Sequence, residues 1–578
     1  MKKMLAFLLA LTLLAGMLPS AVAAELQHTV EKRDYVTYIG SVKSKLTEPL
    51  PLYFLDGVDD LPYLEIDDLG ELLNFMNTEI NEDPNYVLTS SCSDDVVTFE
   101  RDSGYSAVFD FAKDIITFDD YNAFLHNSYD TTLIDMLSEP GLDENGEAQL
   151  FLRDKEKSFD RYGDVKVFDL ASYGIDLVRE GDRYYIPLQT ANDIFFYPAQ
   201  QIGFLFNGQA LFLAKDDHFF SYADGEFTEL SELYYDVPPA ALSDAMAEYG
   251  YRELCMMLDN LYGLKGPHDI RSFGQTFWEI GFDEALSGKD AAESDRALKQ
   301  FIEYYLDDLH SVFNEFSAFG GPQKFTENTG IANLKIAENV ERYKAARAAA
   351  YEDGCPAYEE VGNTAYVTFD KFESKYYAPA FYEGMESGEL PDDTLGLIIY
   401  AHRQITREGS PIKNVVLDLS NNTGGDADAA VFVLGWLLGD APFSVKDMST
   451  GAMSTSVYRA DVNLDRVFDE RDTVSDKKLY CLISPVSFSC GNLVPAALKS
   501  AQKVTLMGRT SGGGSCIVQP VSSAWGALFQ ISGAQRMSFL KNGSFYDIDQ
   551  GIDPDYYIDD IAHFYDRKAL TIYINGLF

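Results

Sequence analysis

The hydrophobic pattern of the chain changes along its length. Residues 30–235 carry short apolar runs broken by polar turn residues, which predicts β-strands with a few helices. Two stretches there share one form, a short strand followed by helical spacing: 61–66 continues into 69–73, and 184–188 continues into 190–196. This similarity indicates a degenerate internal repeat. We find no cluster of catalytic residue types in this sequence region, so we interpret it as an α+β cap or binding region; a purely structural role fits equally well.

A middle segment, residues 240–360, follows a boundary marked by Pro238 and Pro239. Apolar residues recur there at helical spacing. Helices are predicted at 240–262, 290–317 and 331–351. The segment is therefore expected to be mainly helical.

The last part, residues 361–578, alternates strands with helices. Its strands are nearly continuous apolar runs, which is typical of buried parallel strands. They are predicted at 365–369, 415–419, 479–483 and 504–507, with helices at 429–438 and 492–501. Strand–helix–strand alternation of this kind predicts an α/β core with crossover connections.

The N-terminus has the pattern of an export signal. Lys2 and Lys3 precede an apolar run at 5–18, which ends in the small residues Ala-Val-Ala at 21–23. Such a short apolar stretch predicts a cleavable secretory signal at residues 1–23. We therefore expect a secreted, extracellular protein without stable membrane insertion after cleavage. An uncleaved N-terminal anchor is the alternative.

Charge and cysteine content exclude several classes of function. The formal net charge is −47, and it becomes −47 − 2 = −49 once Lys2 and Lys3 are removed with the signal. A surface this acidic repels phosphate backbones, which excludes nucleic acid as a partner. Hydrophobic residues make up 46% of the chain, enough to bury more than one core. The six cysteines are too widely spaced for a disulfide framework or a zinc motif, so most are predicted to be small core residues.

A glycine-containing turn follows the strand at 415–419. Residues 418–425 read Asp-Leu-Ser-Asn-Asn-Thr-Gly-Gly and come directly before a predicted helix. Glycines at such a turn let the backbone adopt positive φ and point N–H groups into one space, where they can bind an anion or an oxyanion. The same pattern also suits a plain tight turn. A nucleotide-binding loop is excluded because the Gly-Lys-Ser/Thr ending is missing.

Ser489 lies at a second strand-to-helix junction, within residues 484–492. A serine there stands at the positive end of the helix dipole, where its Oγ can be exposed beside free backbone N–H groups. Serine is also a preferred N-cap residue. Taken alone, the junction favours the helix cap.

Four motifs that follow one another along the chain favour a functional role for Ser489 over a helix cap. They are 418–425, the Ser-x-x-Asn helix start at 489–492, Met-Gly-Arg-Thr-Ser-Gly-Gly-Gly at 507–514, and Gly-Ile-Asp-Pro-Asp at 551–555. Together they resemble the tail-specific (C-terminal processing) protease family, which includes the tricorn core protease. The resemblance covers roughly residues 290–565 and implies a crotonase-like α/β catalytic core.

The resemblance also implies the roles of particular residues. Ser489 falls at the position of the family's nucleophile. Gly424 or Gly425 falls at its oxyanion glycine, and the backbone N–H of Cys490 is the second donor. The position of the lysine in the family's Ser–Lys branch is Gly514 here. Lys499 lies on the following helix, so a Ser–Lys dyad is not expected.

The tricorn-like branch uses a histidine as its base, in the pattern Leu-Asp-Asp-x-His-Ser/Thr at the end of a helix. Residues 306–311 read Leu-Asp-Asp-Leu-His-Ser, which implies His310 as the general base. The branch has an acid just before the Gly-x-x-Pro-Asp turn, and the aligned position is Ile548. Either neighbour, Asp547 or Asp549, could hold the imidazole tautomer.

The stretch between His310 and Ala365 is too short for the peptide-binding PDZ module that many members of the family contain. Recognition of a free C-terminus by a PDZ domain is therefore not implied. Substrate selectivity is assigned instead to the acidic N-terminal region.

The resemblance thus implies an exported serine endopeptidase that cleaves polypeptides through an acyl-enzyme on Ser489. His310 would be the general base, and no metal or organic cofactor is implied. Two alternatives stay open. The fold could serve as a catalytically inactive module that binds peptides or apolar ligands. Alternatively, Cys490 could be the nucleophile, because a thiol pKa falls at a helix N-terminus.

Overall fold

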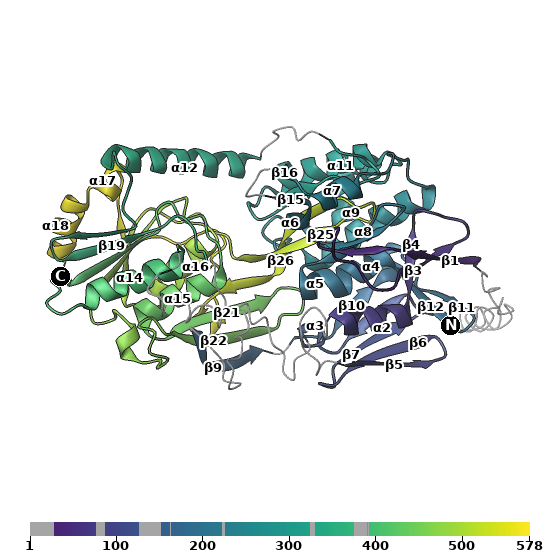
Figure 1. Cartoon of the computed structure of the whole chain (residues 1–578), viewed down its shortest axis with the longest axis horizontal. Helices are drawn as coiled ribbons and strands as arrows, with labels where there is room; N and C mark the ends of the chain where they lie inside the picture. The colour runs from purple at the N-terminus through teal and green to yellow at the C-terminus, as the bar shows by residue number, and fades with distance from the viewer. Residues whose placement is uncertain are drawn as a thin grey trace, which may run out of the picture.

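The structure is a computed structural model that describes residues 28–76, 87–126, 152–161, 163–221, 226–323, 330–374, 390 and 392–577. The predicted signal at 1–23 lies outside these residues. Two lobes lie side by side along the long axis (Figure 1), one built from the N-terminal region with the middle helices and the other from the C-terminal core. Strands of one sheet run between them.

The N-terminal region contains three sheets of three or more strands, and β15 (Phe220–Ser221) pairs with β16 (Glu226–Phe227) in a fourth, as its short apolar runs predict. The first has the order β1 (Val30–Tyr35), β3 (Leu50–Leu55), β4 (Pro62–Glu65), β12 (Arg183–Pro187) and β11 (Val178–Glu180). The second has the order β10 (Lys166–Asp169), β8 (Ile115–Phe118), β7 (Ser106–Asp110), β6 (Val96–Arg101) and β5 (Leu88–Ser93). The third has the order β13 (Gly203–Phe206), β14 (Leu211–Ala214) and β2 (Thr37–Ile39).

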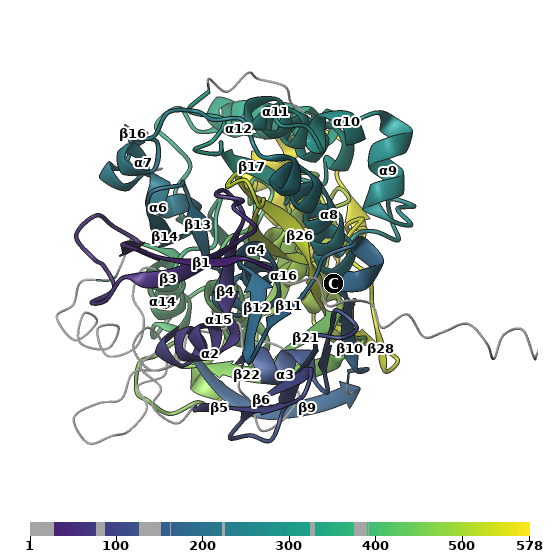
Figure 2. The ribbon, with the colours of Figure 1, turned by 90° about the vertical axis from the view of Figure 1, so that its right-hand side faces the viewer.

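The two repeat-like stretches form neighbouring units of the first sheet. Strand β4 runs into helix α2 (Ile66–Phe75), and β12 runs into α4 (Leu188–Ala191). The two strands pair antiparallel, with Leu64 opposite Ile186; Figure 2 shows them together in the lobe that faces the viewer. The remaining elements here are α3 (Tyr121–His126), η2 (Leu170–Tyr173), the π-helix η3 (Asn192–Phe196), α5 (Tyr197–Gln200), α6 (Asp216–Phe219), β15 (Phe220–Ser221), β16 (Glu226–Phe227) and α7 (Glu229–Tyr234).

The middle segment is mainly helical, as its spacing predicts. It contains α8 (Asp244–Leu261), α9 (Phe273–Ile280), α10 (Asp283–Leu286), α11 (Ala291–Gln300), the π-helix η4 (Phe301–Leu306) and α12 (Ile331–Ala350). The helix predicted over 290–317 is wrong at its end, because it stops at Leu306 and a strand, β17 (Val312–Glu315), follows. Asp307 (φ 43°) and Leu309 (φ 68°) turn the chain out of the helix, and β17 gains a pairing partner in the distant strand β26.

The C-terminal core is an α/β layer structure. Its sheet has the order β18 (Tyr358–Val361), β19 (Thr364–Thr368), β20 (Asn414–Asp418), β23 (Lys478–Ile483), β24 (Val504–Gly508) and β29 (Tyr556–Tyr557), in which all strands after β18 are parallel. One face packs against α14 (Thr394–Thr406), α15 (Ala427–Leu438) and α16 (Cys490–Ala501). The other packs against α12, α17 (Ala562–Tyr565) and α18 (Arg567–Leu577).

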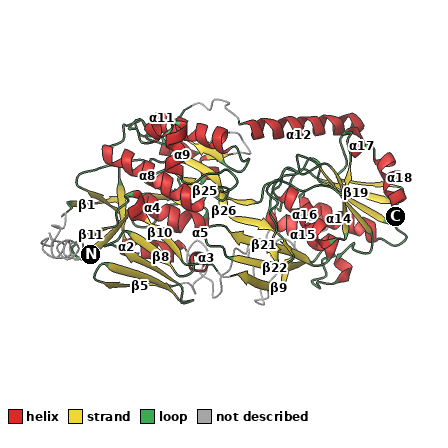
Figure 3. Cartoon of the chain, turned by 180° about the vertical axis from the view of Figure 1, so that it is seen from behind, coloured by secondary structure: helices red, strands yellow, loops and turns green. Residues whose placement is uncertain are grey.

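A second sheet joins the two lobes (Figure 3). Its order is β17, β26 (Leu528–Ser538), β21 (Ala441–Asp447), β22 (Met453–Ala460) and β9 (Leu152–Arg161), with β25 (Cys516–Ser522) also paired to β26. Strand β9 comes from the N-terminal region, so this sheet crosses the boundaries predicted at 235 and 361. The last short elements are η5 (Glu470–Asp472), β27 (Leu540–Lys541) and β28 (Ser544–Phe545).

Candidate active site

Ser489 occupies the turn between β23 and α16 in a strained backbone conformation, with φ 53° and ψ −124°. Such a conformation costs a non-glycine residue about 1–3 kcal/mol and persists only where the surroundings enforce it. Its N–H donates to the carbonyl oxygen of Gly513 (2.9 Å), and its own carbonyl accepts from the N–H of Leu493 (2.8 Å). Within the described chain the Ser489 side chain makes no capping hydrogen bond. The plain helix-cap interpretation therefore does not account for this serine.

The glycine turn after β20 lies directly against Ser489. A Cβ atom added at Gly424 (φ 110°) would come within 2.7 Å of the Ser489 Cβ and 3.2 Å of its Oγ. No side chain fits in that space, so a glycine is required there. The turn predicted at 418–425 and the serine predicted at 489 are thus brought together.

The two glycines differ in what their N–H groups do. The Gly424 N–H donates to Asn422 Oδ1 at 2.9 Å, inside the turn itself. The N–H groups of Gly425 and Cys490 have no acceptor among the described residues. Cys490 is the first residue of α16, where orphan N–H groups and the helix dipole favour negative charge. The N–H groups of Gly425 and Cys490 therefore suit the predicted role of oxyanion donors better than that of Gly424, which allows the close approach of Ser489.

His310 lies in the loop between η4 and β17, and its ring packs on the residue before Ser489. The ring centroids of His310 and Phe488 are 4.6 Å apart. The histidine is 8% exposed, and its backbone N–H donates to Asp308 Oδ1 (3.1 Å). The fold thus brings this distant loop to the Ser489 turn.

Burial lowers the pKa of His310 below its ordinary value of 6.5. The carboxylates of Asp308 and, to a smaller extent, Asp549 favour the charged imidazolium and offset part of that effect. The imidazole is therefore neutral at neutral pH, which is the form that can accept a proton.

The two acids proposed for the histidine have different surroundings. The Asp547 side chain is 57% exposed and forms an ion pair with Arg536. The Asp549 side chain is 11% exposed, accepts hydrogen bonds from Ser515 N–H (3.1 Å) and Oγ (3.0 Å), and acts electrostatically on His310. Ile548 between them is buried. The surroundings of Asp549 fit the role of the acid better than those of Asp547.

Sequence reasoning missed Asp308 as a separate partner of His310. Its Oδ1 accepts the N–H groups of His310 and Ser311, and its Oδ2 accepts the Tyr262 hydroxyl at 2.7 Å. The signal was present, since Asp308 belongs to the Leu-Asp-Asp-x-His pattern at 306–311. Its hydrogen bonds show that it shapes the loop that carries the histidine.

The glycine-rich loop of the 507–514 motif connects the serine and the acid. The Gly513 carbonyl accepts the Ser489 N–H, and the Gly514 N–H donates to the Asp549 carbonyl at 3.0 Å. A Cβ at Gly513 (φ 86°) would lie 1.9 Å from the Asp549 carbonyl oxygen. The motif therefore holds the two turns against each other.

Lys499 and the Cys490 thiol take no part in this arrangement. Lys499, in the last turn of α16, contacts the Asp553 carbonyl and lies 3.5 Å from the Asp555 carboxylate. The Cys490 side chain belongs to the buried core, and burial raises its pKa to about 12. A buried, protonated thiol is inert, which argues against Cys490 as the nucleophile. All six cysteines lie in described parts of the chain and are unpaired.

Comparison with known protein families agrees with the resemblance found in the sequence motifs. Residues 363–558 match the model of peptidase family S41. For this part of the chain, the match confirms the predicted resemblance to tail-specific proteases and supports a peptidase. No curated protein sequence matches the chain.

Three similar solved structures illustrate the range of likeness. The photosystem II D1 C-terminal processing protease is 22% identical with a TM-score of 0.26, over 36% of this chain and 46% of that chain. A lipoprotein from Streptococcus agalactiae is 14% identical with a TM-score of 0.36, over 59% of this chain and 98% of that chain. Mature CPAF complexed with lactacystin is 11% identical with a TM-score of 0.37, over 57% of this chain and 100% of that chain. The chain thus spans about half the length of the D1 processing protease.

The described residues contain neither a membrane-spanning helix nor a cluster of metal-ligand side chains. None of their helices is both long and apolar enough to cross a membrane. They also contain no group of three or more His, Cys, Asp or Glu side chains that could hold a metal ion.

Proposed function

We propose that this protein is an exported serine endopeptidase that cleaves polypeptides through an acyl-enzyme on Ser489, with His310 as the general base. The observation that carries the proposal is the backbone of Ser489, strained at φ 53° and ψ −124° at the start of α16, with a hydroxyl that does not cap the helix. Strained strand-to-helix turns of this kind present nucleophilic serines.

Each step of the reaction has a residue suited to it. The neutral imidazole of His310 takes the proton of the Ser489 hydroxyl as its oxygen attacks the scissile carbonyl. The N–H groups of Gly425 and Cys490 stabilise the oxyanion, at about 3–4 kcal/mol for a donor. The carboxylate of Asp549 stabilises the imidazolium that forms. His310 then gives its proton to the leaving amine, and water hydrolyses the acyl-enzyme.

The test is hydrolysis of an unfolded protein, casein, by the mature chain beside Ser489→Ala and His310→Ala. Both variants are expected to lose at least about 10³-fold in kcat/KM while circular dichroism and the melting temperature stay unchanged. Ser500→Ala, an exposed serine on the same helix α16, is the matched control and keeps full activity. Activity that survives Ser489→Ala would mean that another residue is the nucleophile.

The main alternative is a binding module for peptides or apolar ligands on the same fold. It predicts that wild type hydrolyses casein no faster than Ser489→Ala, yet retains a peptide or apolar ligand in equilibrium dialysis. The chemistry of the site favours the peptidase, because a binding module needs neither a strained serine nor a neutral buried imidazole beside it.

Export is a separate part of the proposal and rests on residues 1–23. Expression with the native N-terminus should release into the medium a chain shortened after Ala23, which N-terminal sequencing would detect. A full-length chain retained in membranes would support the uncleaved anchor instead.

A further inference from the structure

The β25–β26 hairpin, residues 516–538, extends from the peptidase core into the N-terminal lobe (Figure 1). Its two strands pair antiparallel, with Val521 opposite Phe529. Trp525, Phe529 and Ile531 are buried in the hydrophobic core shared by the N-terminal region and the middle helices. This single element therefore touches both lobes and passes beside the His310 loop.

The tip of the hairpin is fixed in the N-terminal lobe by hydrogen bonds to three separate elements. Gln189 Nε2 donates to the Ser522 carbonyl (2.9 Å), and the Tyr234 hydroxyl donates to the Gly526 carbonyl (2.8 Å). The Trp525 Nε1–H donates to Asp295 Oδ1 at 2.8 Å. These partners come from α4, α7 and α11.

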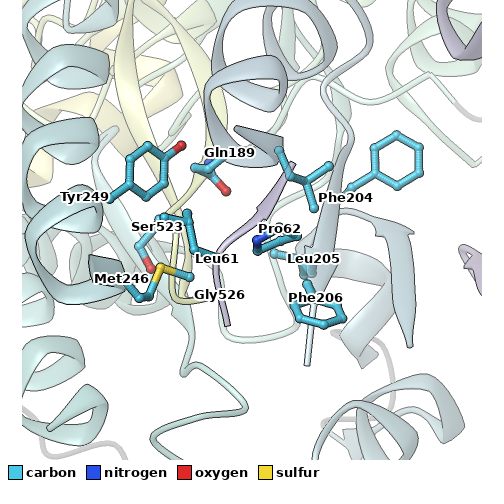
Figure 4. A pocket seen from close by; sticks show the side chains of 12 residues that line it. Leu61, Pro62, Gln189, Phe204, Leu205, Phe206, Met246, Tyr249, Ser523 and Gly526 are labelled. Carbon is cyan, nitrogen blue, oxygen red and sulfur yellow. The ribbon is translucent and has the colours of Figure 1, made fainter. Parts of the chain in front are cut away.

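The packing around the tip is tight. Ser523 and Gly526 of the tip line a cavity together with Gln189 and Tyr249 (Figure 4). Its volume is about 10 Å³, room for roughly one water molecule. Trp525 at the tip is 1% exposed, and a close-packed interior transmits displacement instead of absorbing it.

The middle of the hairpin holds the His310 loop. Gln530 Nε2 donates to the His310 carbonyl oxygen at 2.7 Å, and the Ser532 N–H donates to Ser311 Oγ at 3.1 Å. Gln530 also lies opposite Val312 in the β17–β26 pairing. The base proposed for the reaction is thus attached to β26 through its own main chain.

The end of the hairpin nearest the core holds the acid. Arg536 Nε donates to Ser515 Oγ at 2.8 Å, and Ser515 in turn donates to Asp549. The same strand therefore reaches the base at Gln530 and the acid at Arg536.

The His310 loop needs such external support. Asp307 and Leu309, both just before His310, have positive φ values of 43° and 68°, a conformation that costs a residue such as leucine free energy and persists where the surroundings enforce it. Within the loop, Asp308 accepts the N–H groups of His310 and Ser311. The His310 carbonyl oxygen, in contrast, accepts its hydrogen bond from the Gln530 side chain, outside the loop. Removing that donor leaves a buried carbonyl unsatisfied and a strained loop less constrained.

We propose that Gln530 is a positioning residue for His310, and that the anchorage of the hairpin tip in the N-terminal lobe fixes the catalytic base at the Ser489 turn. The proposal rests on the peptidase function proposed above. It gives the N-terminal region a role in assembling the active site, in addition to any role in selecting substrates. Gln530 itself touches no reacting atom and acts through the His310 main chain.

The test is the variant Gln530→Met, which removes the amide donor at nearly constant volume. The pKa of His310 is measured by NMR titration of its ring protons, and kcat and KM are measured with casein-derived peptides. The pKa should rise toward 6.5, because a loosened ring leaves the apolar contact with Phe488. The kcat value should fall on the order of tenfold with KM nearly unchanged, as expected for a misplaced base.

Gln535→Met is the matched control, since Gln535 lies on the same strand and donates to Asn122 instead of the His310 loop. It should leave the pKa of His310 and kcat at their wild-type values. An unchanged pKa in Gln530→Met, or an equal shift in Gln535→Met, would overturn the positioning role. The NMR readout needs no catalysis, so an inactive wild-type chain would refute the peptidase while the titration still decides whether Gln530 positions His310.

Discussion

The Ser489 turn and the His310 loop are held in different ways. The serine lies in a turn whose contacts come from the glycine turn at 418–425 and the glycine-rich loop at 507–514, all within the same parallel-sheet core. The histidine lies in a loop held by β26 and by Tyr262, which follows α8. The nucleophile is thus built locally, whereas the base depends on how two lobes are joined. Perturbing the contacts that hold the serine turn should therefore cost more activity than perturbing the contacts that hold the His310 loop.

Among variants that keep Ser489 and His310, the largest effect is expected from Gly424→Ala. The added methyl group would lie 2.7 Å from the Ser489 Cβ and would force the serine or the turn to move. We expect kcat to fall on the order of 10²–10³-fold, similar to loss of an oxyanion donor. Casein hydrolysis measures the loss. Gly576→Ala, where the structure shows open space around the glycine, should leave activity unchanged, and a fall there would point to a general loss of folding.

A smaller effect separates the two candidate acids. Asp549→Asn should lower kcat/KM on the order of 10–100-fold, because the buried carboxylate near His310 stabilises the imidazolium formed in the reaction. Asp547→Asn should change it by less than about twofold, since an exposed ion pair contributes little. Steady-state kinetics of both variants test the assignment. Equal losses, or a larger loss in Asp547→Asn, would reverse it.

The pH dependence gives a third measure. Because burial lowers the pKa of His310, the acid limb of kcat/KM should have its midpoint below 6.5, with activity lost as the pH falls through that midpoint. Phe488→Ala removes the ring that covers the imidazole and should move the midpoint upward, toward 6.5. A pH–rate profile of each protein measures the shift. A midpoint that stays fixed would show that Phe488 does not bury the base.

The smallest effect is expected from Tyr234→Phe, which removes only the hydroxyl that donates to Gly526 at the hairpin tip. If the anchorage of the tip helps to place the base, kcat should fall about twofold with KM unchanged. The lost neutral hydrogen bond contributes about 1 kcal/mol, and only part of that loss should reach His310 through the hairpin. Stopped-flow or steady-state assays resolve such a change. A pure rise in KM would assign this contact to substrate binding.

The same contrast explains which elements the sequence predicts well. Strands β20, β23 and β24 are continuous apolar runs because both faces of the parallel sheet are covered, so their pattern is readable without knowing the fold. The helix predicted over 290–317 extends too far, because its end is set by the positive φ of Asp307 and Leu309 and by the pairing of β17 with β26 far along the chain. Pairing with a strand so far along the chain cannot be predicted from the pattern of neighbouring residues.

The residues of the candidate site also differ in whether local sequence or the folded chain identifies them. The sequence motif identifies Ser489 and the glycine turn, since each is a local strand-to-helix junction. It cannot separate Asp547 from Asp549, because the two differ in burial and in their partners Arg536 and Ser515, which only the folded chain brings near. Gln530 carries no motif at all, and its contact with His310 exists only because β26 crosses between the lobes.

The most direct test of the Ser–His peptidase is labelling with a fluorophosphonate, followed by mass spectrometry of the intact chain and its peptides. The proposal predicts one stoichiometric adduct on Ser489 in the wild-type chain, with labelling slowed on the order of 10³-fold or more in His310→Ala, because the hydroxyl is a poor nucleophile without its base. An adduct on another residue, no adduct, or labelling of His310→Ala at the wild-type rate would contradict it.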